Sequence, residues 1–306
     1  MTTTNATRTC PVCGAGHESA ELFLAQNIDE SRIDAASFAS RKIPEYMNHG
    51  MVRCTSCDLV YVDQPPSQDE LATSYHQAAY DSAEEAEHAA DAYINAIAPV
   101  LEKLKGRCNA ALEIGTGTGA FLERLQDAGF TELVGIEPSV AAINAAPANR
   151  KDWIKEGIFE ADMYPPASFD LITCFMTLEH VQDPGALVAA AHKMLRPGGV
   201  FVAVTHDYRG WVNRLLGKRS PIIDIEHMQL FSAQSSEQLL ALRGYGDVGT
   251  RQFQNAYRLS YWLRLVPIPA AMKAATIAVV KRTPFDRFRI AFNVGNTVSW
   301  GVRTAA

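Results

Sequence analysis

Residues 111–120 constrain the fold most, because they combine a short apolar strand, a glycine-rich turn and the start of a helix. An acid, Glu113, lies near the end of the apolar run, Gly115, Gly117 and Gly119 then alternate with threonines, and apolar residues at helical spacing follow. Glycine permits a tight turn and lets a bound group approach the backbone at the start of the helix. The pattern therefore predicts an α/β fold with a cofactor site at the carboxyl end of this strand.

The glycine turn alone does not identify its ligand, because it also fits the dinucleotide fingerprint. Three further motifs follow in order: a second strand that ends in Glu137, the Glu-His-Val run at 179–181, and an Arg-Pro-Gly-Gly turn at 196–199. This order, from about residue 110 to residue 204, resembles the class I S-adenosylmethionine-dependent methyltransferases. An NAD-dependent oxidoreductase would share the turn but not the later motifs.

The resemblance implies which residues hold S-adenosylmethionine. The glycine turn and Glu113 would bind the methionine end of the cofactor, and Glu137 would bind the hydroxyls of its ribose. The expected cofactor contacts are Glu113, Gly115, Thr116, Gly117, Gly119, Glu137, Pro138, Phe159, Glu160 and Glu179.

The adenine end departs from the family pattern. Relatives usually carry an aspartate after the glycine of the third strand, where it accepts a hydrogen bond from the adenine amino group, but here Ile158 follows Gly157. Either Glu160 or Asp162 takes that role, or both are surface acids and the adenine is held by backbone groups and Phe159.

Four of the six cysteines form two Cys-x-x-Cys pairs that are separated by 40 residues. Two such turns present four sulfurs, which suit a tetrahedral zinc site and leave no open position for catalysis. Disulfides are the competing interpretation, but a reducing cytosol disfavours them, and an iron–sulfur centre or metal-free thiols are further alternatives. We expect structural zinc on Cys10, Cys13, Cys54 and Cys57, and core positions for Cys108 and Cys174.

The second cysteine pair belongs to residues 52–67, which resemble the N-terminal zinc ribbon of many bacterial methyltransferases. Relatives usually have glycine at the position of Asp58. Residues 67–105 are rich in Ala, Glu and Tyr at helical spacing, which predicts helices that cover the cofactor mouth. There Tyr75 and Tyr80 either contact cofactor or substrate or simply pack.

The chain has 306 residues, 47% of them hydrophobic, so it can bury one full α/β core and still carry additional modules. Its alternating strands and helices predict a parallel sheet covered on both faces, and the resemblance implies a seven-stranded, Rossmann-like doubly wound sheet. Strands are expected near 109–114, 132–137, 152–155, 169–175 and 199–205, and helices near 118–128, 139–146, 184–195 and 235–242. The expected units are a zinc-ribbon module at 1–66, a helical lid at 67–105, the methyltransferase domain at 106–250 and a basic C-terminal extension at 251–306.

Methyl transfer from a sulfonium requires in-line positioning of the acceptor and, for a hydroxyl acceptor, a base. Histidine suits that role because its pKa lies near neutrality. The candidates, in order of preference, are His227, His180 and His206. The competing interpretations are that His180 orients its loop or contacts the cofactor, and that His206 is a surface residue.

Charge is distributed unevenly along the chain. The net charge of −6 argues against a nonspecific nucleic-acid binder. Residues 251–306 contain nine Lys/Arg and one acid, so they carry +8 and the remainder carries −14. This asymmetry indicates an anionic substrate or a membrane surface, although solvated arginines or an oligomer contact would also explain it.

The longest apolar stretch, residues 261–280, is interrupted by arginine, prolines and lysine, so it is expected to lie on a membrane rather than to cross one. The first eight residues lack the apolar core of a secretory signal. We therefore expect a cytoplasmic protein, with peripheral contact at the inner membrane through the basic region. The oligomeric state is left open.

Together these features predict an S-adenosylmethionine-dependent methyltransferase that acts on a small-molecule or lipid-linked anionic acceptor. Bacterial relatives with this layout resemble enzymes of sugar, polysaccharide or secondary-metabolite pathways, so O-methylation of a glycosyl or secondary-metabolite hydroxyl is the first expectation. The alternatives are C-methylation of a nucleotide-linked sugar, whose enzymes are longer and carry a different glycine motif, an NAD-dependent oxidoreductase, and a non-catalytic cofactor-binding or docking protein.

Overall fold

The computed structural model describes residues 8–34, 37–39, 45–80, 83–266 and 268–304. Most of the N-terminal segment considered for a secretory signal, residues 1–7, lies outside the described residues, as does Pro267. The strands are β1 Ala20–Leu24, β2 Met51–Cys54, β3 Val60–Val62, β4 Ala110–Ile114, β5 Glu132–Glu137, β6 Ile154–Glu156, β7 Phe169–Phe175, β8 Leu195–His206, β9 Gln229–Leu230, β10 Tyr245–Gln252, β11 Asn255–Arg258, β12 Arg289–Phe292 and β13 Asn296–Arg303. The α-helices are α1 Gln68–His76, α2 Ala83–Leu101, α3 Ala120–Asp127, α4 Val140–Ala145, α5 Ala148–Lys151, α6 Pro184–Met194, α7 Trp211–Leu216, α8 Ala233–Ala241, α9 Leu259–Leu265 and α10 Ala270–Lys281. The short 3₁₀ helices are η1 His17–Ser19, η2 Glu30–Arg32, η3 Glu102–Leu104, η4 Gly217–Arg219 and η5 Pro284–Arg287.

The larger sheet has seven strands in the order β10-β13-β8-β7-β4-β5-β6. The five strands from β8 to β6 run parallel, and β13 runs antiparallel to both of its neighbours. The first of these strands along the chain, β4, lies inside the sheet, so the winding reverses between β4 and β7, where sheets of this kind bind their ligands. This arrangement confirms the predicted doubly wound, seven-stranded sheet.

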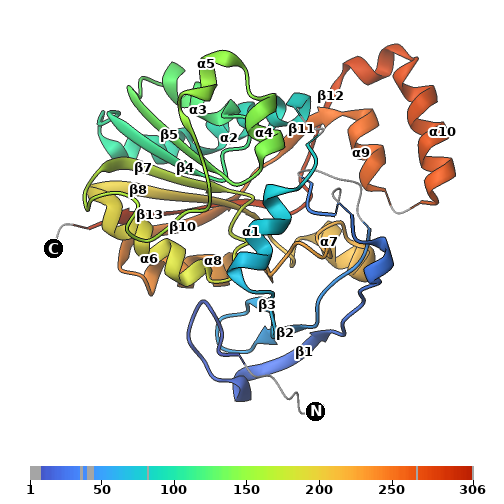
Figure 1. Cartoon of the computed structure of the whole chain (residues 1–306), viewed down its shortest axis with the longest axis horizontal. Coiled ribbons are helices and arrows are strands. Elements are labelled where there is room, and N and C mark those ends of the chain that lie inside the picture. Colours follow the sequence, from blue (N-terminus) through green and yellow to red (C-terminus); the bar gives the residue numbers. More distant parts are fainter. Residues whose placement is uncertain (1–7, 35–36, 40–44, 81–82, 267, 305–306) are drawn as a thin grey trace.

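Alternation along the central strands produces one apolar layer on each face of the sheet, and helices lie on both faces (Figure 1). On β7, Leu171 and Phe175 join the layer formed with α2 and α3, whereas Ile172 and Cys174 join the layer formed with α6 and α8. Every residue of β7 is buried, as expected for a strand that is covered on both faces. The core position predicted for Cys174 is confirmed.

The position of β13 corrects one predicted boundary. The extension expected at 251–306 includes this strand, but β13 pairs with β8 from Asn296 to Val302 and is part of the sheet. Its residue Val298 is fully buried in the same apolar layer as α2 and α3. The seven-stranded sheet therefore extends beyond residue 250, whereas β11 and β12 pair with each other in a separate hairpin.

The smaller N-terminal sheet has the order β1-β2-β3-β9. Its last strand, β9, comes from the region after β8, so the ribbon is joined directly to the domain that contains the seven-stranded sheet. Asp58 follows the second cysteine pair with a φ of 65°, the left-handed conformation that Gly14 adopts with a φ of 74° after the first pair. The Asp58 carboxylate pairs with the Arg209 guanidinium and accepts a hydrogen bond from the Tyr208 hydroxyl at 2.7 Å. These contacts help to hold a non-glycine residue in a conformation that favours glycine.

Helix α2 packs against α3 beside the sheet. The Arg124 guanidinium on α3 pairs with Glu87 and Asp91 on α2, each at 2.9 Å. Helix α2, which lies within the predicted helical range 67–105, is thus fixed to the seven-stranded domain by both apolar contacts and ion pairs.

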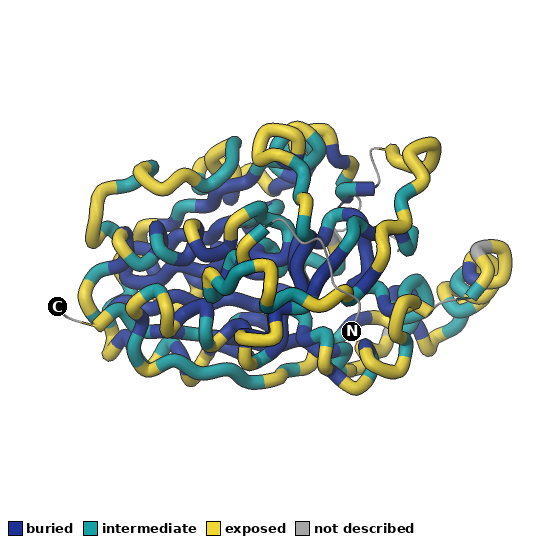
Figure 2. The backbone as a smooth tube through the Cα atoms, turned by 90° about the horizontal axis from the view of Figure 1, so that it is seen from below, coloured by how far each residue is buried: buried dark blue, intermediate teal, exposed yellow. Residues whose placement is uncertain are grey.

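The β11–β12 hairpin, α9 and α10 form a C-terminal arm that projects from one end of the molecule (Figure 1). Figure 2 shows that much of this end is exposed. None of the helices in the described ranges combines the length and the apolarity that crossing a bilayer requires.

Candidate active site

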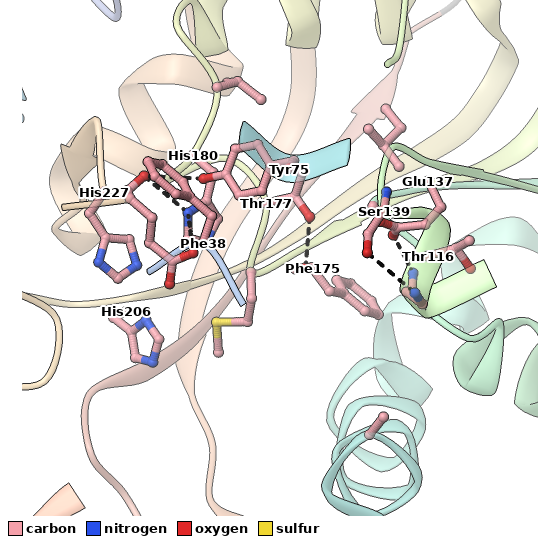
Figure 3. A pocket seen from close by; sticks show the side chains of 18 of the residues that line it. Phe38, Tyr75, Thr116, Glu137, Ser139, Phe175, Thr177, His180, His206 and His227 are labelled. Carbon is pink, nitrogen blue, oxygen red and sulfur yellow. Dashed lines mark hydrogen bonds and ion pairs between the residues drawn. The ribbon is translucent and has the colours of Figure 1, made fainter. Parts of the chain in front are cut away.

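A cavity of about 1130 Å³ opens at the carboxyl ends of the central strands. The glycine turn and Glu137 line one end of it, and the three candidate histidines line the other. In Figure 3, Phe175 and Thr177 lie between these two groups. Side chains from α1 and α2 and from the C-terminal arm complete the wall. We call these the cofactor end and the acceptor end, after the roles that the sequence predicts for their residues.

The turn after β4 adopts a backbone that requires glycine. Gly115 has a φ of 78°, and a Cβ atom built there would lie 2.1 Å from Thr177 Oγ1. Gly117 has a φ of 57°, and a Cβ atom built there would meet no heavy atom within 4 Å. The turn is thus packed against Thr177 on one side and open to the cavity on the other.

Two buried carboxyl groups flank this turn. Glu113 Oε2 accepts a hydrogen bond from Thr116 Oγ1 at 2.6 Å, and Glu137 accepts from the backbone amides of Gly117 at 2.6 Å and Ser139 at 2.8 Å. Burial raises the pKa of Glu113 to about 8, although the hydrogen bond from Thr116 opposes the shift. Burial also raises the pKa of Glu137, against the effect of its two amide donors. Two buried acids beside an open glycine turn fit the ammonium group and the ribose hydroxyls of S-adenosylmethionine.

Of the other predicted cofactor residues, Thr116, Pro138, Phe159 and Glu160 line the cavity. At the adenine end, Ile158 and Asp162 also line it, and the two acids, Glu160 and Asp162, are exposed while Phe159 is half-buried. Gly119 instead begins α3, where a Cβ atom would approach Arg150.

Glu179 lies at the acceptor end instead of beside the cofactor turn. Its side chain is only 1% exposed, and its Oε1 accepts from the backbone amide of His206 at 2.8 Å and lies 3.2 Å from His206 Nδ1. The Glu179 carbonyl accepts from the amide of Met228 at 2.7 Å, which fixes the segment that carries His227. Glu179 therefore supports the histidines.

The three histidines come from separate segments, His206 from the end of β8 and the other two from loops, and they meet at one end of the cavity (Figure 3). The rings of His180 and His227 stack with centroids 4.7 Å apart, and the ring of His206 lies edge-on to His227 at 6.3 Å. His180 Nδ1 lies 3.2 Å from the Glu226 carbonyl and 3.8 Å from its carboxylate. The Tyr75 ring packs edge-on against His180, and its hydroxyl donates to the Glu226 carbonyl at 3.3 Å.

This cluster offers two kinds of chemistry. A histidine held by a carboxylate can take up a proton from an acceptor. Two subsets also have ligand atoms within 4.8 Å of one another, which is a spacing that a metal ion can use. These subsets are Glu179–His206–His227 and His180–Glu226–His227.

Two asparagines that the sequence did not identify also line the acceptor end. Asn296 is fully buried and lies opposite His206 in the pairing of β13 with β8. Within the described residues, three buried amide atoms have no hydrogen-bond partner: Nδ2 and Oδ1 of Asn296, and Oδ1 of Asn255. Because buried amides are costly when unpaired, these groups are suited to a polar ligand. In the sequence, the signal for Asn296 is its place as the polar first residue of a segment, 296–302, in which apolar and small or polar residues then alternate.

The four predicted zinc ligands meet in the ribbon. The sulfurs of Cys10 and Cys57 lie 3.4 Å apart, and those of Cys13 and Cys54 lie 3.6 Å apart. All four ligand atoms lie within 4.8 Å of one another. Each pair closes the same type of turn, because the amide of Gly14 donates to the carbonyl of Cys10 and the amide of Asp58 donates to that of Cys54. This cluster fits a zinc ribbon.

Comparison with known proteins agrees with this geometry. The sequence model of the family described as "Methyltransferase domain" matches residues 82–248. The chain is 30% identical over 167 residues to the ubiquinone biosynthesis O-methyltransferase of Idiomarina loihiensis, a match that covers 52% of this chain and 60% of the relative. It is 32% identical over 126 residues to the protein of the same name from Vibrio atlanticus, covering 39% and 53%. The chain thus spans between half and two thirds of the length of these relatives.

A solved structure of a methyltransferase from Archaeoglobus fulgidus matches with a TM-score of 0.48 and 14% identity, over 70% of this chain and 94% of that one. The family match covers more than half of the chain and includes the glycine turn and the Glu-His-Val motif. On these grounds the chain belongs to the family of S-adenosylmethionine-dependent methyltransferases.

Proposed function

We propose that the protein transfers the methyl group of S-adenosylmethionine to a hydroxyl oxygen of a small-molecule or lipid-linked acceptor. The observation that carries this proposal is the convergence of His180, His206 and His227 on the end of the cavity opposite the glycine turn. A hydroxyl acceptor must lose a proton, so a site that places histidines and carboxylates there is suited to O-methylation. The relatives that bear the name O-methyltransferase support the same choice.

S-adenosylmethionine supplies an activated methyl group on its sulfonium. The Glu113 carboxylate would hold the cofactor ammonium, and Glu137 would accept hydrogen bonds from the ribose hydroxyls. Phe159, which is half-buried at the adenine end, would pack on the base. These contacts leave the histidine end of the cavity for the acceptor.

His206 is the best-placed base. Its side chain is 25% exposed and lines the cavity, and Glu179 holds its Nδ1 from behind. When the acceptor hydroxyl is methylated, its proton would pass to His206. Glu179 orients the ring and stabilises the imidazolium. His227, the first choice from the sequence, is more deeply buried and stacks on His180, so we assign it a supporting position.

The acceptor end favours a ring-bearing molecule. Tyr257, Tyr261, Trp262 and Phe292 line the cavity there, and flat aromatic side chains pack well on sugar or aromatic rings. The unpaired amides of Asn255 and Asn296 would bind polar groups on that ring. We therefore propose a glycosyl or secondary-metabolite hydroxyl as the acceptor.

For the ribbon we propose a structural zinc ion. Cys10, Cys13, Cys54 and Cys57 supply four sulfur ligands, so the ion would have no open position. Its role would be to fix the two turns and, through Asp58, the segment that contains Arg209.

The reaction is tested by incubating the full-length protein with S-adenosylmethionine that carries a ¹³C methyl group and an extract of its source organism. We expect a methyl-labelled product with a new methoxy carbon in its NMR spectrum. No labelled product, despite measured cofactor binding, would contradict the proposal, and so would a label on carbon or nitrogen.

The base is tested in the same assay with single variants. His206→Ala should slow turnover about 100-fold or more, and Glu179→Gln should slow it less. His192→Ala is the matched control, because His192 packs against Tyr245 and does not line the cavity. Affinity for S-adenosylhomocysteine should remain near that of the wild type in each case. A large loss of turnover in His227→Ala, with His206→Ala still active, would assign the base to His227.

A further inference from the structure

Helix α10 is apolar yet largely exposed. Nine of its twelve residues are Ala, Met, Ile or Val, and it contains no acid. Met272 and Val279 are exposed by 60% and 63%. The lysine near its start, Lys273, is turned inward, where its Nζ donates to the Arg264 carbonyl at 2.7 Å. The helix therefore presents apolar side chains to its surroundings while a charged group is buried.

More exposed apolar side chains lie next to this helix along the chain, and α10 itself packs against α9 and η5. Of the twelve large hydrophobic side chains that are exposed within the described residues, seven lie between residues 266 and 292. Trp211 is also exposed, and its ring packs edge-on against that of Phe292 with the ring centroids 5.9 Å apart. The rings of Phe292 and Trp262 pack in the same way with the same centroid distance. The C-terminal apolar surface consists of Val266, Met272, Val279, Phe285, Phe288, Ile290 and Phe292. Exposed apolar surfaces of this kind mark contact sites.

The charges of the arm favour an anionic partner. Lys281 and Arg282, at the end of α10, are exposed. The one acid of residues 251–306, Asp286, is buried and accepts hydrogen bonds from the amide and hydroxyl of Ser260 at 2.8 and 3.0 Å. A second copy docked symmetrically on this surface would bring the cations of both copies together. Aromatic and aliphatic side chains flanked by Lys and Arg instead suit the surface of an anionic bilayer.

The same surface continues into the cavity. Val266, Ile290 and Phe292 are exposed, and all three also line the cavity. The neighbouring residues Trp262 and Leu265 line it as well. An apolar path therefore leads from the exposed arm to the wall of the acceptor end.

We propose that the C-terminal apolar surface docks on anionic lipid bilayers, and that an acceptor with a lipid tail reaches the histidines past Val266, Ile290 and Phe292. Docking is independent of the reaction, whereas the route of the acceptor rests on the proposed function. The arm is shallowly inserted in this arrangement, since no described helix can span the bilayer.

Docking is tested by flotation of the full-length protein with vesicles of phosphatidylcholine alone or with one quarter phosphatidylglycerol. We expect co-flotation with the anionic vesicles, at least ten-fold weaker binding to the neutral ones, and weakening by salt. Two double variants, Phe285→Ser with Phe288→Ser and Met272→Ser with Val279→Ser, should each lower binding at least ten-fold. The matched control is Leu22→Ser with Leu242→Ser, which alters side chains that are 54% and 55% exposed elsewhere.

Absence of co-flotation with anionic vesicles would overturn the docking proposal, and so would an equal loss in the control variant. A dimer in sedimentation velocity that the Phe285/Phe288 variant abolishes would also overturn it, because a second copy would then cover the surface. Affinity for S-adenosylhomocysteine shows whether each variant is folded. The route of the acceptor is tested separately: the ¹³C label should partition with extracted lipids, and a label found only in water-soluble products would overturn that part while docking stands.

Discussion

Glu113 allows a quantitative test of the cofactor end, because binding there should release a proton. Burial raises the pKa of this carboxyl group from 4.5 to about 8 in the ligand-free protein. The ammonium group of a bound cofactor favours the charged carboxylate and should lower the pKa again. Affinity should therefore rise as the pH increases from 6 towards 8, a range in which the ligand keeps its ammonium group.

The size of the effect follows from proton linkage. If the bound ligand returns the pKa of Glu113 to 4.5, protonation weakens binding about 100-fold at pH 6 and about two-fold at pH 8. The dissociation constant of S-adenosylhomocysteine, which has the same amino-acid and ribose groups and is chemically stable, should thus fall about 50-fold between these pH values.

The assay is isothermal titration calorimetry at pH 6, 7 and 8, in buffers with different ionisation enthalpies. The wild type should release nearly one proton at pH 6 and 7. Glu113→Gln keeps an acceptor for Thr116 but has no proton to release, so its affinity should vary little with pH. Glu137→Gln should still show affinity that rises with pH, but the rise should move to lower pH, because the Glu137 charge also raises the pKa of Glu113. A flat profile in the wild type, or the same slope in Glu113→Gln, would refute the reasoning.

Two further predictions concern the ribbon and the glycine turn. Cys13→Ser should remove the metal and lower the thermal stability of the N-terminal region. Elemental analysis measures the metal, calorimetry measures the stability, and Cys108→Ser is the control. An unchanged zinc content in Cys13→Ser would refute the four-sulfur site. Gly115→Ala should weaken S-adenosylhomocysteine binding at least ten-fold, because its Cβ would collide with Thr177. Gly117→Ala should lower the thermal stability less than Gly115→Ala does, because its Cβ would meet no protein atom although it would face the cavity, and equal losses of stability would contradict this explanation.

The cofactor end was largely predictable because its signals are local. Glu113 and Glu137 lie at the carboxyl ends of β4 and β5, and the glycines follow β4 directly. Parallel strands bring their carboxyl ends to one edge of the sheet. The two Cys-x-x-Cys pairs are equally local signals, so the sequence alone predicts the four candidate zinc ligands.

The rest depends on contacts between distant residues. The paired residues of β13 and β8 are at least 90 positions apart in the sequence, and no pattern in residues 251–306 predicts that these two strands pair. Asn296 reaches the cavity only because of this pairing. The choice of base among the histidines also depended on the fold. Only the fold shows that Glu179 supports His206, and that His227 stacks on His180 and is more deeply buried.

The join between the ribbon and the domain has a consequence for how the chain can be divided. Strand β9 pairs with β3, and the Arg209 guanidinium pairs with the Asp58 carboxylate. Both β3 and Asp58 precede residue 67. A fragment that starts at residue 67 would keep the glycine turn and both buried glutamates but would lose the groups that fix the segment between His206 and β9. The N-terminal module therefore helps to fix the segment that follows His206, and we expect a fragment without it to hold that segment less firmly.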